Sequence, residues 1–302
     1  MKKPAEIAIL TTDKKSLFKD TIGEIERQGY GVDILEWEKI TISIKEDSLQ
    51  IISNFQARTS NFDQYKLMLN HVPIDICSQF YFAFDKLLNI KILNNWEGVL
   101  HSANKLKSSI KIQGHGIRQP KTVLLNNSNF EIGIAEAEAI MHYPMVMKEI
   151  NSDNGEKVWL VEDCRSAWVI WNEAGTKDIF ILQEYIKGEN LRVVLLGNRI
   201  IYSVKNLLSL SDFRANSKFN IGTKPYPLTG TEQRQIVKIS KCLGIHFAGL
   251  DFIKTRNGLY FIEANVKPGI SVDNDKLKPL GINIFKEIGT YLIEELKKVK
   301  QN

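Results

Sequence analysis

The segment from Phe247 to Asn265 contains the residues whose types and spacing are most informative about chemistry. Asp251, Glu263 and Asn265 stand within two apolar runs that flank the turn Arg256-Asn257-Gly258. Two apolar runs around an Asn-Gly turn are typical of a β-hairpin. The segment is therefore predicted to be an antiparallel pair of strands that carries three oxygen-bearing side chains.

The turn of this hairpin determines which residues face each other. If Gly258 takes the left-handed position of a three-residue loop, Thr255 pairs with Leu259. Counting back from that pair places Asp251 directly opposite Glu263. Two facing carboxylates repel each other by an amount comparable to the ~0.2–1 kcal/mol typical of cross-strand pairs, so the arrangement needs a compensating charge.

A divalent cation is the most direct source of this charge. Asn265 falls on the same face as Glu263, two residues further along the strand. Three oxygen ligands with no His or Cys nearby favour a hard ion such as magnesium. We therefore interpret Asp251, Glu263 and Asn265 as metal ligands. The alternative is a pair of solvated carboxylates at a sheet edge beside an unrelated asparagine.

Lys148 is a second residue with chemical potential, because it lies in a predicted strand, Met145–Ile150, that begins with apolar residues. A lysine in such a strand must find an anionic partner or extend its ammonium group to the surface. The turn-rich segment 151–155 follows and could fold over a ligand. Taken alone, the lysine also fits an ordinary surface position.

The elements that position these residues can be predicted from hydrophobic periodicity. The chain opens with a strand at Glu6–Leu10, a helix at Leu17–Arg27 and a strand at Val32–Leu35. This is a β-α-β unit. Its first turn, Thr11–Lys15, contains no glycine, which argues against a dinucleotide-binding fingerprint and a Rossmann oxidoreductase.

Short strands dominate the middle of the chain, and amphipathic helices follow. The predicted strands are Met145–Ile150, Lys157–Val161, Phe180–Tyr185, Leu191–Leu196 and Arg199–Val204. The last two flank Gly197-Asn198, so the set is predicted to form an antiparallel meander. The predicted helices are Lys105–Gly114, Glu232–Leu243 with a capping box from Thr229, and Ile284–Lys297.

Composition limits the function classes. The 302 residues are 43% hydrophobic and 25% charged, ordinary values for a globular protein of two or three packed units. No apolar run reaches the roughly 18 residues of a membrane span, and we expect a cytoplasmic protein. Three scattered cysteines suggest neither zinc nor redox chemistry. A net charge of +5 suits phosphate-bearing ligands or an acidic partner, but is too small to indicate nucleic-acid binding.

Five short stretches follow one another in a fixed order and with compatible spacing. They are Asn94 to Lys105, Pro120-Lys121-Thr122, Asn190-Leu191-Arg192, Asp212 to Asn216, and Ile262 to Asn265. This ordered set resembles the ATP-grasp superfamily, most closely its RimK-type branch of amino-acid (glutamate) ligases, including LysX-like enzymes. The resemblance implies an α+β ATP-grasp fold, in which two lobes clasp ATP after an α/β domain. The implied boundaries are 1–95, 96–182 and 183–302.

The resemblance also implies roles for individual residues. The implied nucleotide-binding residues are Lys105, Lys148, Gln183, Glu184, Ile186, Glu189 and Asn216, with Glu189 at the ribose and the hinge residues at the adenine. The implied metal ligands are the three residues of the hairpin. The implied catalytic residues are Arg192, Arg214 and Lys205, which would bind the reacting carboxylate or its acyl phosphate. Asn206 stands where the family often has an arginine, so Lys205 would have to turn inward to replace it.

The expected activity is that of an ATP-dependent carboxylate–amine ligase that uses magnesium, with manganese as an alternative ion. An amino acid would be joined to the carboxylate of a peptide, an acidic carrier protein or a small metabolite. The sequence is also compatible with a homo-oligomer. Neither nucleic acid nor membrane is an expected partner. One alternative is a non-catalytic ATP-binding regulatory protein on the same fold, because the loop after Lys148 has a single glycine, Gly155. An AMP-forming ligase has no supporting motif.

Overall fold

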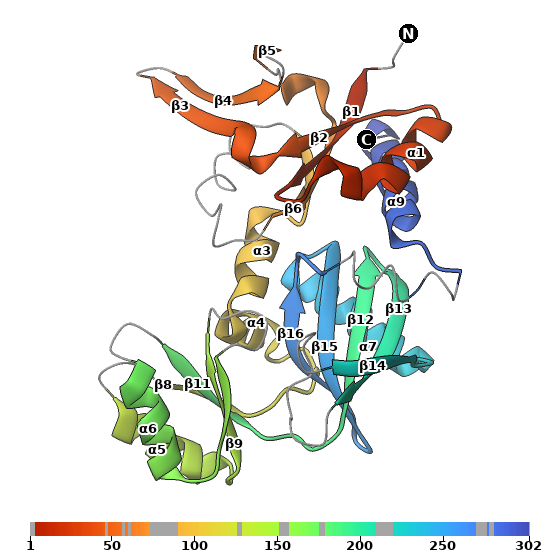
Figure 1. The fold of residues 1–302 in the computed structure, drawn as a ribbon. Coiled ribbons are helices and arrows are strands. Elements are labelled where there is room, and N and C mark those ends of the chain that lie inside the picture. The colour runs from red at the N-terminus through yellow and green to blue at the C-terminus, as the bar shows by residue number, and fades with distance from the viewer. Residues whose placement is uncertain are drawn as a thin grey trace.

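The N-terminal part of the protein is a parallel sheet in the order β2-β1-β6-β7 (Figure 1). The computed structural model describes residues 4–45, 48–55, 58–59, 62–72, 90–125, 129–150, 157–174, 179–208, 220–269, 277 and 281–301. The strands of this sheet are β1 (Ala5–Thr11), β2 (Gly31–Glu36), β6 (Leu67–His71) and β7 (Lys91–Leu93). The central strand β1 is a continuous apolar run, as expected for a parallel strand that is buried on both faces.

Short elements surround this sheet. They are η1 (Lys15–Phe18), α1 (Lys19–Arg27), η2 (Trp37–Lys39), β3 (Ile40–Lys45), β4 (Ser48–Phe55), β5 (Arg58–Thr59) and η3 (Phe62–Gln64). Strands β3, β4 and β5 form a separate three-stranded sheet. The β-α-β opening predicted from periodicity is present, with the first turn of its helix formed by η1.

Two consecutive helices, α3 (Trp96–Ala103) and α4 (Lys105–Ile112), connect the N-terminal sheet to the rest of the chain. Each begins with an asparagine whose side chain accepts a backbone hydrogen bond: Asn95 caps α3 and Asn104 caps α4. The predicted helix from Lys105 therefore starts where expected and ends two residues early. Both helices contact β16 and α7 of the C-terminal lobe.

The central lobe is an antiparallel sheet in the order β10-β9-β11-β8. Its elements are β8 (Thr122–Leu125), α5 (Phe130–Ile140), β9 (Met145–Glu149), β10 (Val158–Val161), α6 (Cys164–Ala174) and β11 (Phe180–Glu184). The two helices cover one face, where Met145 and Met147 are fully buried in an apolar cluster. Lys148 alternates with these residues and therefore points from the opposite face.

The C-terminal lobe is an antiparallel sheet in the order β14-β13-β12-β15-β16. Its strands are β12 (Glu189–Leu196), β13 (Arg199–Leu208), β14 (Asn220–Pro225), β15 (Phe247–Thr255) and β16 (Gly258–Asn265). Helix α7 (Gly230–Leu243) packs on one face and has the predicted capping box between Thr229 and Glu232. The predicted meander is antiparallel, as expected, but it is divided between two sheets at the connection from β11 to β12.

The last helix, α9 (Ile284–Gln301), packs against α1 and β6 of the N-terminal sheet. Figure 1 shows α9 beside that sheet, while the central and C-terminal lobes lie next to each other at the opposite end of the molecule. Contacts of α3, α4 and α9 thus cross the predicted domain boundaries, and those boundaries stay a prediction. None of the helices in the described ranges is long and apolar enough to cross a membrane.

Candidate active site

The hairpin of β15 and β16 brings Asp251 and Glu263 directly opposite each other. The predicted pair is correct, but the predicted turn is wrong. The loop has two residues, because Thr255 pairs with Gly258 rather than with Leu259. A register shift between Asp251 and Phe252 restores the alignment further along the strands.

The third predicted metal ligand, Asn265, pairs with Gly249 two positions further along the same hairpin and so lies on the same face. Its side-chain oxygen accepts a hydrogen bond from the backbone of Lys267 at 2.9 Å, which fixes the amide and leaves the oxygen a second lone pair. Two carboxylates and an amide oxygen on one face are a donor set that suits a magnesium ion. The residues present therefore fit the metal that the sequence predicts.

Arg192 provides a positive charge at this hairpin. It lies opposite Asp251 across β12 and β15, and its Nη1 donates to Asp251 Oδ2 at 2.6 Å. The guanidinium lies over Gly249, where a Cβ would collide with it. Gly249 thus allows Arg192 to lie flat against the sheet, and Arg192 compensates part of the charge of the facing carboxylates.

Lys148 reaches the same group of residues from the central lobe. Its side chain is 9% exposed, and burial lowers its pKa from 10.5 to about 8. The negative charges of Glu263 and Asp251 oppose this change, whereas the positive charge of Lys105 adds to it. The two predicted lysines and two of the predicted metal ligands therefore interact electrostatically with one another through Lys148.

The position of Lys105 follows from a contact between α4 and the end of β9. The backbone nitrogen of Lys105 donates to the carbonyl of Ile150 at 3.2 Å, two residues after Lys148. The Lys105 side chain is itself 9% exposed. Two buried lysines on different elements, one of which interacts with the carboxylates of the hairpin, are suited to hold a polyphosphate between themselves and a metal ion.

The predicted hinge is the connection from β11 to β12. Gln183 is buried, and its amide nitrogen donates to Thr122 at 3.0 Å, while its amide oxygen has no hydrogen-bond partner among the described residues. The backbone N–H of Glu184 donates to the carbonyl of Lys121 at 2.9 Å. Of the two backbone groups of Glu184, the carbonyl is therefore the one available to a ligand. Ile186 is half-buried in the connection itself.

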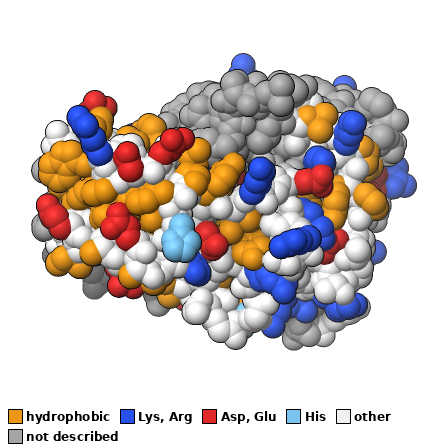
Figure 2. Space-filling view, turned by 90° about the horizontal axis from the view of Figure 1, so that it is seen from below, with side chains coloured by type: hydrophobic (Ala, Val, Ile, Leu, Met, Phe, Trp, Pro, Cys, Tyr) orange, Lys and Arg blue, Asp and Glu red, His pale blue; other side chains and the backbone are white. Residues whose placement is uncertain are grey.

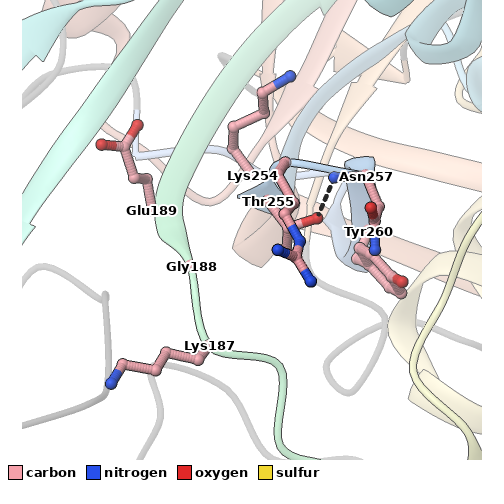
Figure 3. A pocket seen from close by; sticks show the side chains of 8 residues that line it. Lys187, Gly188, Glu189, Lys254, Thr255, Asn257 and Tyr260 are labelled. Atoms are coloured by element: carbon pink, nitrogen blue, oxygen red, sulfur yellow. Dashed lines mark hydrogen bonds between the residues drawn. The ribbon is translucent and has the colours of Figure 1, made fainter.

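A cavity of about 630 Å³ lies where the hinge meets the tip of the β15–β16 hairpin (Figure 3). Gly188 passes so close to the carbonyl of Lys254 that a Cβ would collide with it. Figure 3 shows the side chains of Lys187 and Glu189 on the same side of this connection, with Tyr260 on the other side. The close approach explains why the connection between the lobes carries a glycine at this point.

Lys205 and Glu189 lie on the wrong face of the sheet for the roles predicted for them. Lys205 pairs with Leu191, which is buried against α7, and forms an ion pair with Glu189 on that face. The cause is a bulge at Ile201, which has no partner on β12 and turns the following side chains of β13 to the opposite face. Asn206 thereby takes the Arg192 face, and we leave Lys205 and Glu189 out of the proposed site.

Arg214 and Asn216 lie outside the described residues, so the structure does not place them. Asn94 is a site residue whose importance we did not derive from the sequence. It is fully buried at a φ of 57° and accepts from the backbones of His246 and Phe247 at 2.7 and 2.8 Å. Its amide donates to the carbonyls of Phe247 and Val266 at 2.7 and 3.3 Å, so it joins the start of β15 to the end of β16.

The metal side of the hairpin also contacts the N-terminal sheet. Lys267 Nζ donates to Thr12 at 2.7 Å and lies 3.3 Å from an oxygen of Asp13. His71 lies 3.2 Å from the other oxygen of Asp13, and this hydrogen bond lowers the pKa of Asp13, while burial lowers the pKa of His71. The first loop of the protein is thereby tied to the residue that fixes Asn265.

Comparison with known proteins identifies the architecture. A family model described as the RimK-like ATP-grasp domain matches residues 102–292, more than half of the chain. The chain belongs to the RimK-like ATP-grasp family. Both the resemblance and the fold class predicted from the sequence are confirmed.

Relatives of this RimK-like chain are named as ligases. A probable alpha-L-glutamate ligase of Pasteurella multocida (strain Pm70) is 26% identical over 281 residues, covering 88% of this chain and 87% of the relative. A RimK domain ATP-grasp protein from Sphaerobacter thermophilus has the same fold with a TM-score of 0.69 and 16% identity, covering 95% of this chain and 99% of that one. The ATP-grasp ligase PsnB, solved with a minimal precursor, magnesium and ADP, matches at 11% identity and a TM-score of 0.72, covering 98% and 99%.

Proposed function

We propose that this protein is an ATP-dependent carboxylate–amine ligase that releases ADP and phosphate. The observation that carries the proposal is the electrostatic interaction of the buried Lys148 of the central lobe with Glu263 and Asp251, which face each other on the C-terminal lobe. This arrangement suits a nucleotide whose phosphates are held by lysines on one side and by a metal on the other. The ligase names of the Pasteurella multocida relative and of PsnB support the enzyme over the regulatory alternative.

In the proposed reaction, an oxygen of the substrate carboxylate attacks the γ-phosphorus of ATP, and the bond to the ADP oxygen breaks. The amine then attacks the carbonyl carbon of the acyl phosphate, loses a proton, and phosphate leaves with the electrons of the carbon–oxygen bond. Lys105 and Lys148 would hold phosphates, and Arg192 would bind the carboxylate or acyl phosphate. Magnesium, held by the hairpin residues, would neutralise charge on the phosphates.

The substrate class is a finer part of this proposal. We expect an amino acid, acidic or small and polar, to be joined to the carboxylate of a peptide, carrier protein or small metabolite. The glutamate ligase name of a relative and the precursor peptide bound to PsnB in another structure both support this. Lys205 lies on the other face of the sheet, so Arg192 is the implied catalytic residue that the described structure offers to a substrate carboxylate.

Product analysis tests the function. The protein is incubated with magnesium-ATP, a panel of amino acids, and carboxylates whose oxygens are labelled with ¹⁸O. We expect ADP and phosphate in equal amounts only when both substrates are present, with one labelled oxygen in the phosphate, because the acyl phosphate passes it on. Glu263→Gln serves as the inactive control. AMP and pyrophosphate as products, or tight ATP binding without turnover across the panel, would contradict the proposal.

A further inference from the structure

A second concave surface lies away from the cleft between the lobes, between β13 and α7. It is a groove of about 1130 Å³ whose floor includes Ile200, Leu228 and Val237. Its cationic lining residues are Arg199 on β13 and Arg234, Lys238 and Lys241 on α7, and no Asp or Glu in the described part of the chain lines it. The groove therefore combines an apolar floor with charges of one sign.

The three cations of α7 form a single stripe. Arg234, Lys238 and Lys241 follow one another at spacings of four and three residues, which places them on one side of the helix. All three are exposed, while Ile236 and Ile239 on the other side are buried in the core. The helix thus presents its basic side to the groove rather than scattering its charges around the surface.

These charges are poorly neutralised by the protein itself. Within the described residues, Lys238 and Lys241 form no ion pair, and Arg234 donates to the neutral hydroxyl of Thr231 at 3.0 Å. Arg199, by contrast, is engaged on α9: its Nη1 contacts Glu294 at 3.2 Å, its guanidinium lies over the Tyr291 ring, and its Nε and Nη2 are buried, so the charge available in the groove comes from α7. Figure 2 likewise shows Lys and Arg gathered over the C-terminal lobe, with more Asp and Glu over the central lobe.

The wall formed by β13 is suited to an extended chain. The stretch from Arg199 to Tyr202 pairs with β12 on one side, whereas β14 joins the sheet from Val204 onward. A described strand therefore covers only part of the outer edge of β13, and such an edge can accept another extended segment. The same strand continues to Val204, which lies opposite Arg192 of the proposed active site.

We propose that this groove binds an acidic, extended segment of a protein or peptide and thereby holds a macromolecular substrate whose reacting carboxylate enters the cleft. The identification of the occupant as a substrate rests on the proposed ligase function, whereas the binding does not. Charge complementarity selects an acidic partner, and the largely aliphatic floor suits alternating apolar side chains. A nucleic acid would instead favour exposed aromatic residues on which bases stack. The described lining of the groove has two tyrosines: Tyr202 is buried, and Tyr226 is half-buried with its hydroxyl bonded to Glu232.

The test measures binding of a fluorescein-labelled decapeptide of alternating glutamate and valine by fluorescence anisotropy. We expect the Kd to rise at least tenfold for Lys238→Glu/Lys241→Glu, and to rise on the addition of salt for the wild type. The matched control is Lys286→Glu/Lys297→Glu, which makes the same charge change at two exposed lysines of α9 and should leave the Kd within twofold. Circular dichroism checks that each variant folds.

Several outcomes would overturn the proposal. One is equal affinity for a decapeptide with glutamine in place of glutamate, and another is equal loss of binding in the control variant. A third is a single-stranded oligonucleotide that displaces the peptide and binds more tightly, which would assign the groove to nucleic acid. A dimer that dissociates in the groove variant, seen by sedimentation, would assign it to a second copy. ATP affinity, measured by calorimetry, should be unchanged, so a failed ligase assay and a failed docking site are distinguishable.

Discussion

Replacing Lys148 by methionine should stabilise the nucleotide-free protein while it abolishes tight ATP binding. Burial lowers the pKa of Lys148 from 10.5 to about 8, so the folded protein holds this side chain charged at neutral pH at a cost. At about 1.4 kcal/mol for each pH unit of displacement, this cost is about 3 kcal/mol. Methionine fills similar space without a charge, and some contacts of the lysine stem will change. We expect a net gain of about 1–3 kcal/mol in the free energy of unfolding at pH 7.

The pH dependence distinguishes a charge effect from packing. Between pH 8 and 10.5 the unfolded chain keeps the Lys148 proton more readily than the folded chain, so the free energy of unfolding of the wild type rises with pH through this window. Below pH 8 the cost is fully present, and above pH 10.5 both states are neutral and the cost is gone. The advantage of Lys148→Met over the wild type should therefore be largest near pH 7 and shrink towards pH 10.

Urea unfolding in EDTA without nucleotide, at pH 7 and at pH 9.5, measures both effects. Lys157→Met is the matched control, because this lysine is 43% exposed beside Glu149 and its loss should change stability by less than about 1 kcal/mol. Magnesium-ATP should then raise the stability of the wild type and of the control, but not that of Lys148→Met. A variant less stable than the wild type at pH 7, or an advantage independent of pH, would refute the reasoning.

Four further substitutions probe the hairpin and the asparagine that joins its ends. Gly249→Ala should push Arg192 off the sheet and lower turnover at least tenfold. Asp251→Asn and Glu263→Gln should both abolish magnesium-dependent turnover, but calorimetry without ligands should show the larger loss of stability for Asp251→Asn, because it breaks the ion pair with Arg192. Asn94→Asp should cost about 2–4 kcal/mol in urea unfolding, because a carboxylate oxygen would replace the donor that faces two backbone carbonyls.

Two neighbouring substitutions serve as controls for this series. Gly269→Ala adds a Cβ where nothing lies within 4 Å, so turnover should not change. Asn95→Asp keeps an oxygen that can cap α3, and we expect stability within about 0.5 kcal/mol of the wild type. A loss in either control as large as in its partner would mean that the corresponding effect is not specific to the contact described.

The β15–β16 hairpin shows which part of the site could be predicted from the sequence. The facing of Asp251 and Glu263 was predicted with a three-residue loop, whereas the loop has two residues and a later register shift compensates. The pair survives because the apolar residues of both strands must face α7, and this requirement restores the register after a different turn. The pattern of buried residues thus determines which residues of the two strands face each other more strongly than the length of the turn does.

Lys205 illustrates the opposite case. A regular hairpin continuing from Gly197-Asn198 would place Lys205 opposite Asn190, on the face of Arg192. The bulge at Ile201 moves Lys205 one position along, opposite Leu191, and hence to the other face. No residue type in Arg199–Val204 marks that bulge. Likewise, the approach of Lys105 to the end of β9 depends on tertiary packing and has no signal in local spacing.

The ion pair between Arg192 and Asp251 bears on the roles proposed for both residues. Asp251 is proposed to bind magnesium and Arg192 to bind the reacting carboxylate, and the two side chains also bind each other. Side chains that are 17% and 25% exposed lose part of their hydration, so mutual neutralisation limits the cost of keeping both charges here before substrates arrive. When metal and substrate bind, Asp251 exchanges an arginine for a metal ion and Arg192 exchanges one carboxylate for another. Because each charge keeps a partner throughout, neither side chain is an isolated, partly buried charge at any stage. Loss of either residue should therefore impair the proposed role of the other.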